Sequence, residues 1–408
     1  MKEYDLPVGW KYVSLADIAN VINGVSFKPN DIKKEGIRIL RSGNIQSGYL
    51  VLKDDDVFLD NTYYNRDNTL QYLDNCITAS TGSIDVLGKC GTVFEEINNC
   101  QIGAFMRLVR SKSKDDALYI SFILHSPLYY QYIRRLSKNG TSINNINNSH
   151  LEEFKFPLPP KNVKEEISKW YYSLEKKIAL NTRMNAELEA MAKQLYDYWF
   201  VQFDFPDENG KPYKSSGGKM VYNPTLKREI PEGWEACTLG DFCDLYQPKT
   251  IGTDEMSKNG KYHVYGANGL IGFYDKYNHE KSEIVMACRG NSCGAINRTM
   301  PFSWITGNAM VLSVKDKSIS NEFISQCTNY MNIKGAITGS GQPQLTRENL
   351  APLLMIYPLQ NILKQFSKKV TPIIEHRLHI QKTNEYLTHL RDSLLPMLMN
   401  GQVTVEQE

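Results

Sequence analysis

Two histidines provide the spacing in this sequence that comes nearest to a metal site. His376 and His379 lie three positions apart, so one face of a helix would carry both imidazoles. No third histidine or cysteine stands beside them. We therefore interpret the pair as part of a solvated helix face and predict no metal site.

The remaining reactive side chains form no recognisable enzyme motif. The eight cysteines include no C-x-x-C pair, which argues against a zinc ribbon or a thioredoxin-type site. There is no G-x-x-x-x-G-K-[ST] loop for ATP, no G-x-S-x-G and no H-E-x-x-H. The segment "PLPPK" (157–161) lacks the polar and aromatic residues of an amino-methyltransferase motif. We predict no catalytic residues, and a binding or assembly protein without a cofactor of its own.

A repeated opening indicates how the chain is organised. "LPVGWKYVSLADIANV" (6–21) matches "IPEGWEACTLGDFCDL" (230–245) at five identical positions, one of them a tryptophan. Between each opening and the next helix lie short apolar runs bounded by turn residues, such as "ITASTGSID" (77–85) and "IVMACRGNSC" (284–293). "GAFMRLV" (103–109) similarly resembles "GNAMVLS" (307–313). The pattern predicts a duplicated β-rich domain.

Two long stretches without glycine follow the β-rich regions. Each carries apolar residues at steps of three or four, which predicts a helix about 60 Å long with one apolar seam. Asparagine occupies a seam position in each helix, and Pro372 should kink the second helix or mark a restart. The seam consists of Ile167, Leu174, Ile178, Asn181, Leu188 and Leu195 in the first helix, and Ile373, Ile380, Asn384, Leu387 and Leu394 in the second.

These observations predict an α+β fold with a pseudo-two-fold internal repeat. Two β-rich domains are separated by two long helices that pair as an antiparallel coiled coil. If each helix instead capped its own domain, the two seams would not meet. The expected parts are a first domain at 1–160, a spacer helix at 161–201, a linker at 202–229, a second domain at 230–358 and a spacer helix at 359–400.

The charge and hydropathy of the chain indicate which partners and which location to expect. The 47 basic and 45 acidic residues nearly balance, so bulk electrostatics does not indicate a nucleic-acid partner. No apolar run approaches the roughly 20 residues that span a bilayer, and the N-terminus has no signal-peptide pattern. We expect a cytoplasmic protein that does not bind membranes.

The layout and several segments resemble the DNA-specificity subunits of type I restriction–modification systems. The strongest resemblance is the join "LYDYWFVQFDFPDENGKPYKSSGGKMVYNPTLKREIPEGW" (195–234). "GIRILRSGNIQSGYL" (36–50), "YHVYGANGLIGFYD" (262–275) and "GSGQPQLTRENL" (339–350) are also similar to the family. The first half does not repeat "YGANG" and the second does not repeat "RSGNI", which suggests that the halves read different sequences.

The resemblance implies a function in host defence and DNA methylation. Each half would be a target-recognition domain that reads one part of a split, asymmetric site on double-stranded DNA. Two methyltransferase subunits would bring S-adenosylmethionine, and motor–nuclease subunits would bring ATP and magnesium. The chain itself would be non-catalytic. The same halves would also suit the recognition subunit of a type II enzyme that cuts on both sides of its site, and a two-domain scaffold without DNA is a third interpretation.

Under this resemblance, polar residues in turn-rich loops are the candidates for base contacts. Arginine can bond guanine twice, and asparagine or glutamine can bond adenine twice. The alternative is that several of these residues only cap turns. The candidates are Arg41, Asn44, Thr81, Ser83, Asn139, Thr141, Ser142 and Asn144 in the first domain, and Tyr265, Asn268, Arg289, Asn291, Gln342 and Gln344 in the second.

Overall fold

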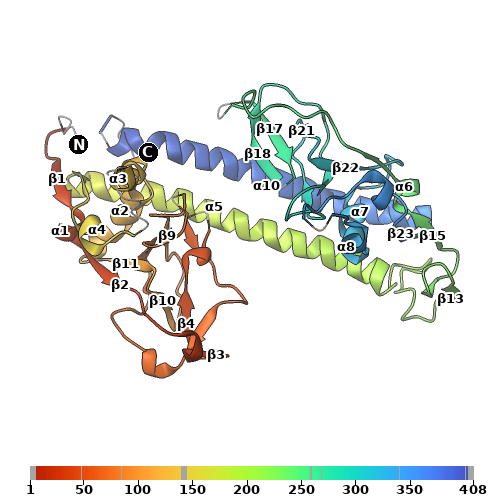
Figure 1. Cartoon of the computed structure of the whole chain (residues 1–408), viewed down its shortest axis with the longest axis horizontal. Helices are drawn as coiled ribbons and strands as arrows, with labels where there is room; N and C mark the ends of the chain where they lie inside the picture. Colours follow the sequence, from red (N-terminus) through yellow and green to blue (C-terminus); the bar gives the residue numbers. More distant parts are fainter. Residues whose placement is uncertain are drawn as a thin grey trace. The chain divides into compact units, whose positions relative to one another are not determined.

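The chain forms two compact units in this computed structural model (Figure 1). The structure describes residues 6–46, 48–83, 85–138, 145–257, 260–267, 269–339, 341–399 and 401–402. Unit 1 comprises residues 1–181 and 383–408, and unit 2 comprises residues 182–382. Each unit therefore contains one β-rich domain and one segment from each of the two long helices.

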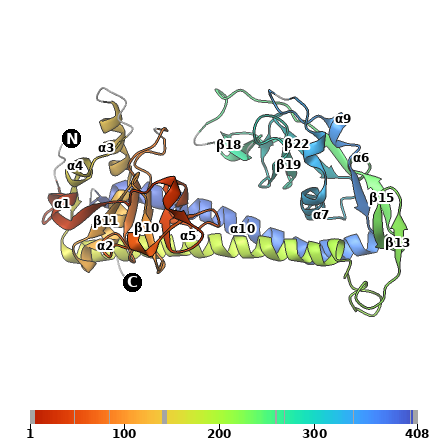
Figure 2. The same cartoon turned by 60° about the horizontal axis from the view of Figure 1, so that its bottom comes forward.

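Unit 1 is built on a six-stranded sheet in the order β2-β11-β8-β9-β6-β5, with a smaller sheet in the order β10-β4-β7-β3. Helix α2 packs on the larger sheet beside β11 (Figure 2). Its elements are β1 (Lys11–Ser14), α1 (Leu15–Ile18), β2 (Ala19–Asn23), β3 (Ile32–Lys33), β4 (Ile37–Leu40), β5 (Ile45–Gln46), β6 (Tyr49–Leu50), β7 (Val57–Leu59), β8 (Asn75–Thr78), β9 (Cys90–Thr92), β10 (Cys100–Ile102), β11 (Met106–Ser111), α2 (Lys114–Leu124), α3 (Pro127–Lys138), α4 (Asn148–Glu152) and β12 (Lys155–Leu158).

Unit 2 repeats this plan with fewer strands. Its main sheet has the order β16-β22-β19-β20, and a second sheet has the order β18-β17-β21. The elements are β13 (Met220–Asn223), β14 (Arg228–Pro231), β15 (Glu235–Thr238), α6 (Leu239–Phe242), β16 (Cys243–Tyr246), β17 (Tyr262–Gly266), β18 (Gly269–Tyr274), β19 (Ile284–Ala287), β20 (Ile296–Arg298), β21 (Trp304–Ile305), β22 (Ala309–Val314), α7 (Glu322–Cys327), α8 (Ile333–Ala336), α9 (Arg347–Leu350) and β23 (Leu354–Tyr357).

The central strands explain why the middles of the two domains match only loosely in sequence. Every residue of β8 and of β22 is buried, so neither strand alternates between a buried and an exposed face. The β8–β11 pair and the β19–β22 pair are both antiparallel and occupy the same place in the two sheets. Buried strands accept many apolar residues, and the frame can therefore repeat while its sequence drifts.

The repeated "PxGW" opening is a turn that both units need. The Trp10 amide donates to the Pro7 carbonyl at 3.1 Å, and the Trp234 amide donates to the Pro231 carbonyl at the same distance. Gly9 has φ of +85° and Gly233 has φ of +82°. A positive φ at the third residue defines a type II turn and favours glycine there. The turn directs the chain into β1 or β15.

The long helices α5 (Lys161–Tyr196) and α10 (Gln360–Met399) run antiparallel within each unit. In unit 1, Glu175 contacts Arg391 and Asn181 contacts Asn384. In unit 2, Glu189 contacts Arg377, and the rings of Tyr196 and Phe366 meet. A π-helical turn, Asp197–Val201, extends α5, so the stretch predicted as helical is helical throughout. The predicted α+β fold class is confirmed.

The seam of the helices is buried unevenly. Met184 and Met191, which also match the seam spacing, are exposed. We expected Pro372 to kink the helix or mark a restart; helix α10 continues without interruption through Pro372, so the proline marks no restart. The buried seam residues are Ile167, Leu174, Ile178, Asn181 and Ile380, and the half-buried ones are Leu188, Leu195, Ile373, Asn384, Leu387 and Leu394.

The segment predicted as a linker is an ordered part of unit 2. Phe205 stacks between the rings of Tyr213 and Trp234, with centroid distances of 4.7 and 5.1 Å. Strands β13 and β14 pair antiparallel and close the segment into a hairpin. No helix in the described ranges is both long and apolar enough to cross a membrane.

Candidate nucleic-acid interface

Loops that are far apart in the sequence of unit 1 meet at one end of its sheets. The Gly103 amide donates to the Leu40 carbonyl at 2.9 Å, the Ala79 amide to the Phe105 carbonyl at 2.9 Å and the Ile146 amide to the Ala79 carbonyl at 2.6 Å. We call residues 41–44, 79–83, 103–105 and 145–146 loop cluster 1. Two of the three groups of base-contacting residues predicted for this domain lie in it, Arg41 with Asn44 and Thr81 with Ser83.

Unit 2 builds the same arrangement from the equivalent hydrogen bonds. The Thr306 amide donates to the Tyr265 carbonyl at 2.9 Å, the Cys288 amide to the Asn308 carbonyl at 3.2 Å and the Leu345 amide to the Cys288 carbonyl at 2.9 Å. Arg289 also forms a β-bridge with Gln344. We call residues 266–267, 288–291, 306–308 and 341–345 loop cluster 2, omitting Ser340 and Asn268, which the structure does not describe.

Most of the described candidates present polar side chains to solvent. Thr81 is half-buried, and its hydroxyl accepts a hydrogen bond from the Ser83 amide at 3.3 Å. The exposed candidates are Arg41, Ser83, Arg289, Asn291, Gln342 and Gln344. Asn139, Thr141, Ser142, Asn144 and Asn268 lie outside the described residues. The structure thus brings Arg289, Asn291, Gln342 and Gln344 together in loop cluster 2.

Asn44 and Tyr265 have structural roles, contrary to the prediction. Asn44 is buried, and its side chain accepts from the Arg41 amide at 2.8 Å and donates to the Val51 carbonyl at 3.0 Å and to Asp56. Tyr265 is buried, and its hydroxyl accepts from the Met300 amide at 3.0 Å. Both side chains are used inside their own domain, so the turn-capping alternative holds for Asn44 and a core role for Tyr265.

The two motifs that do not match in sequence occupy equivalent places. Because Gly103 bonds to Leu40 and Thr306 bonds to Tyr265, β4 and β17 are equivalent strands. "RSGN" begins directly after β4, and "GANG" begins at Gly266, the last residue of β17. Arg41 is exposed where the second unit has Gly266, which is buried. The absence of each motif from the other half reflects different loops on one frame.

Sequence comparison missed two exposed residues in the loop clusters. Phe105 is 71% exposed, and the hydrogen-bond pattern makes Asn308, also exposed, its counterpart. Aligning "GAFMRLV" with "GNAMVLS" pairs Phe105 with Ala309 instead. The strand register, in which Met106 pairs with Thr78 and Ala309 with Ala287, shifts the alignment by one residue.

Buried polar side chains join the domain of unit 1 to its helix segments. In unit 1, the Tyr49 hydroxyl donates to the Glu175 side chain, and Arg391 donates to the same carboxylate at 2.8 Å. Burial, together with the charge of Glu175, raises the pKa of the Tyr49 hydroxyl. The hydroxyl therefore remains a proton donor that joins the domain to α5 and α10.

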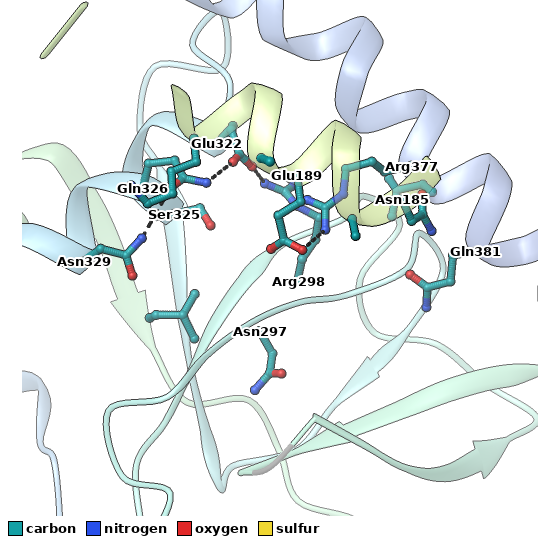
Figure 3. A pocket seen from close by; sticks show the side chains of 15 residues that line it. Asn185, Glu189, Asn297, Arg298, Glu322, Ser325, Gln326, Asn329, Arg377 and Gln381 are labelled. Atoms are coloured by element: carbon teal, nitrogen blue, oxygen red, sulfur yellow. Dashed lines mark hydrogen bonds and ion pairs between the residues drawn. The ribbon is translucent and has the colours of Figure 1, made fainter. Parts of the chain in front are cut away.

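In unit 2, two ion pairs line one polar pocket between the domain and the helix segments (Figure 3). Arg298 bonds to Glu322, which also accepts from Gln326 at 2.7 Å, and Arg377 pairs with Glu189 at 3.0 Å. Arg298 and Glu322 join β20 to α7 inside the domain, whereas Arg377 and Glu189 join α10 to α5. Because each carboxylate faces an arginine, we assign both pairs a structural role in the walls of the pocket.

Metal-binding groups are not part of either loop cluster. The described residues contain no group of three or more histidine, cysteine, aspartate or glutamate side chains placed to hold a metal ion. His376 and His379 are both exposed on α10. The chemistry available at the loop clusters is hydrogen bonding, charge and apolar contact.

Comparison with known proteins gives one consistent family. The model described as "Type I restriction modification DNA specificity domain" matches residues 7–190 and again residues 231–386. The two matches confirm the internal duplication.

Individual relatives carry corresponding names. The MjaIX specificity subunit of a type I restriction enzyme from Methanocaldococcus jannaschii is 26% identical over 71% of this chain and 69% of that relative. The EcoKI specificity subunit from Escherichia coli is 29% identical over 38% of this chain, and the match spans only 34% of that relative.

One solved structure supports the fold. It is the S subunit of a type I restriction–modification system from M. genitalium, with a TM-score of 0.60 and 17% identity over 98% of each chain. The family match covers both halves of the sequence, the two loop clusters repeat with it, and the chain belongs to the type I restriction–modification DNA-specificity family.

Proposed function

We propose that this specificity subunit reads an asymmetric, bipartite site on double-stranded DNA, one half-site with each loop cluster. The observation that carries the proposal is that equivalent hydrogen bonds hold the two loop clusters while their exposed side chains differ. A repeated frame supplies two reading surfaces, and unlike side chains give unlike base preferences.

The exposed side chains offer suitable chemistry for base edges. Arg41 and Arg289 can each donate two hydrogen bonds to a guanine, and Asn291, Gln342 and Gln344 can each bond an adenine twice. The net charge of +2 means that a few positioned residues and the partner subunits supply most phosphate contacts.

The remaining steps belong to partner subunits. Two methyltransferase subunits would bind S-adenosylmethionine and turn an adenine out of the duplex, since a base inside the stack cannot be reached. Motor–nuclease subunits using ATP and magnesium would join for cleavage. This chain would select the sequence, and we infer that it performs no catalysis.

Mapping modified adenines tests this proposal directly. The chain is co-expressed with its cognate methyltransferase subunit, and the modified positions in the host genome are sequenced. A single split motif with two different halves is expected. A stable complex that modifies no adenine would instead support a scaffold without a DNA-reading function.

Single substitutions then test the loop clusters. Arg41→Ala and Arg289→Ala should each cost about 1–3 kcal/mol of binding free energy and relax one position of the motif. Arg183→Ala is the matched control, because Arg183 is exposed on α5, pairs with Glu187 and belongs to neither loop cluster. If both loop variants leave motif and affinity unchanged, the assignment of base contacts is wrong.

A further inference from the structure

Phe105 is an apolar side chain in polar surroundings. It is 71% exposed, and its neighbours in loop cluster 1 include Arg41, Ser83 and Asn145, all exposed and polar. A site for a protein partner normally presents a contiguous apolar patch. A single ring among hydrogen-bonding groups fits a ligand whose surface mixes acceptors with one small apolar group.

The backbone fixes the place from which this ring projects. The Phe105 carbonyl accepts from the amides of Ala79 and Ser80 at 2.9 and 3.0 Å, and the Met106 amide donates to the Gly103 carbonyl at 2.9 Å. The turn from Gly103 to Met106 is thus tied to the loop that follows β8. A fixed turn loses little conformational entropy when its side chain meets a ligand.

Unit 2 has the same turn with different chemistry. The Ala309 amide donates to the Thr306 carbonyl at 3.0 Å, and the Asn308 carbonyl accepts from the Cys288 amide at 3.2 Å. Asn308 is exposed. At one structural position, therefore, unit 1 offers an aromatic ring and unit 2 offers an amide.

We propose that Phe105 contacts the C5-methyl group of a thymine in the major groove of the half-site read by unit 1. Thymine presents an acceptor and a methyl group on that edge, whereas adenine presents a donor and an acceptor that suit an amide. Asn308 would accordingly bond an adenine in the half-site read by unit 2. This inference rests on the proposed function, because it requires that the loop clusters read DNA.

The test uses the complex of the full chain with its methyltransferase subunit and synthetic duplexes of the recognised motif. The half-site of unit 1 is identified by exchanging residues 1–155 for those of another family member. Each thymine in that half-site, on either strand, is then replaced by uracil, which lacks the methyl group. One replacement should weaken binding about fourfold, the loss expected for one buried methyl group.

Variants of Phe105 test whether its aromatic ring causes this loss of binding. Phe105→Ala should bind the thymine and uracil duplexes equally, and Phe105→Leu should retain part of the discrimination. Val8→Ala is the control, since Val8 is fully exposed in the "PxGW" turn and should leave the uracil effect intact. Asn308→Ala should relax one position of the other half-site only.

Several results would overturn the inference. One is a half-site without an A·T pair, and another is a uracil effect that persists in Phe105→Ala. Equal weakening of both duplexes by Phe105→Ala, with no uracil effect in the parent complex, would point to an apolar wedge between base steps instead. A parent complex that modifies no motif would refute the proposed function itself, which is a separate result.

Discussion

The two units use different side chains where the main sheet contacts a helix of the domain. We call this contact the joint: it lies between β9 and the end of α2 in unit 1, and between β20 and α7 in unit 2. Their strand registers make Thr92 in β9 the counterpart of Arg298 in β20. In unit 1, Thr92 bonds to Asn75 at 2.6 Å and to His125 at 3.0 Å, three uncharged side chains. In unit 2, Arg298 bonds to Glu322 and to Asn321, forming an ion pair whose carboxylate is 2% exposed (Figure 3).

This difference shows which parts of the duplication were free to change. The turn, the order of the four main-sheet strands that both units share and the antiparallel closing pairs β1–β12 and β15–β23 are the same in both units. Both the buried joint and the exposed loops differ. A frame stabilised by apolar strands tolerates either kind of joint, provided that every buried polar group has a partner.

The largest expected effect removes one partner from the charged joint. Glu322→Ala leaves the Arg298 guanidinium buried without its carboxylate, and such a change costs about 3–5 kcal/mol. Thr92→Val in unit 1 removes uncharged hydrogen bonds and should cost about 1–3 kcal/mol. Urea unfolding followed by hydrogen exchange in each unit measures both losses.

An exposed carboxylate provides the control for this contrast. Glu229 is exposed on β14, and Glu229→Ala should change the stability by less than about 0.5 kcal/mol. Equal losses of unfolding free energy from Glu322→Ala and Thr92→Val would mean that breaking the buried ion pair costs no more than breaking uncharged hydrogen bonds.

In the helix pair, equivalent asparagine-to-leucine substitutions should change stability in opposite directions in the two units. Asn181 is buried in unit 1 and donates to Asn384 at 2.8 Å. The shift of 199 residues that superposes β12 on β23 makes Ile380 and Asn185 the equivalent pair in unit 2. There the Asn185 side-chain oxygen is buried without a hydrogen-bond partner among the described residues.

We expect Asn181→Leu to destabilise the protein by about 1–3 kcal/mol, because the Asn384 oxygen loses its donor. Asn185→Leu should stabilise it by about 1 kcal/mol, since an unsatisfied acceptor is removed. Thermal unfolding measures both. The double variant Asn181→Leu/Asn384→Leu should recover the lost stability but blur the preferred spacing of the half-sites, because a polar seam pair selects one alignment.

Sequence predicted the parts of this fold that local chemistry determines. Gly9 and Gly233 lie where a turn requires positive φ. The seam asparagines are conspicuous in the sequence because the other seam positions are apolar. Single-residue signals of this kind are visible without knowing which segments meet.

The loop clusters could be predicted only in part, because they depend on contacts between distant segments. Polar turn residues indicated Arg289 and Gln344, but the same reasoning selected Asn44 and Tyr265, whose side chains are buried. Phe105 was missed because its polar surroundings come from three other loops. Strand register determines these neighbours, and a one-residue alignment error concealed them.

The charged and uncharged joints should also differ in how the stability of their units depends on pH. Burial lowers the pKa of His125 to about 3, and the charge of Arg391 adds to the shift. The unfolded chain therefore takes up this proton first, and His125 destabilises unit 1 as the pH falls below about 6.5, by about 1.4 kcal/mol per pH unit until about pH 3.

His125→Gln should remove that slope while keeping a donor for Thr92. The comparison is made between the parent chain and the variant, because burial also lowers the pKa of His279 in unit 2. Unfolding in urea at pH 6, 5 and 4 gives the slopes, and parallel slopes would show that His125 does not titrate on unfolding.

The smallest effect concerns the turn that both units share. An alanine at positive φ costs roughly 1–2 kcal/mol, so Gly9→Ala and Gly233→Ala should both destabilise their units. Their surroundings differ, since a Cβ on Gly9 would lie 3.0 Å from Pro160, whereas a Cβ on Gly233 would lie 3.6 Å from Leu359. The first contact is tighter than ordinary van der Waals packing and involves a rigid ring.

Gly9→Ala should therefore lower the unfolding temperature slightly more than Gly233→Ala. Val8→Ala and Glu232→Ala, at the preceding position of each turn, control for effects unrelated to φ, and both side chains are exposed. Gly9→Asn adds a second check, because asparagine tolerates positive φ better than alanine but brings the same Cβ toward Pro160. If Gly9→Asn is as stable as the parent chain, the contact with Pro160 contributes nothing. The two turns are then energetically equivalent, and the units differ only in their joints and loops.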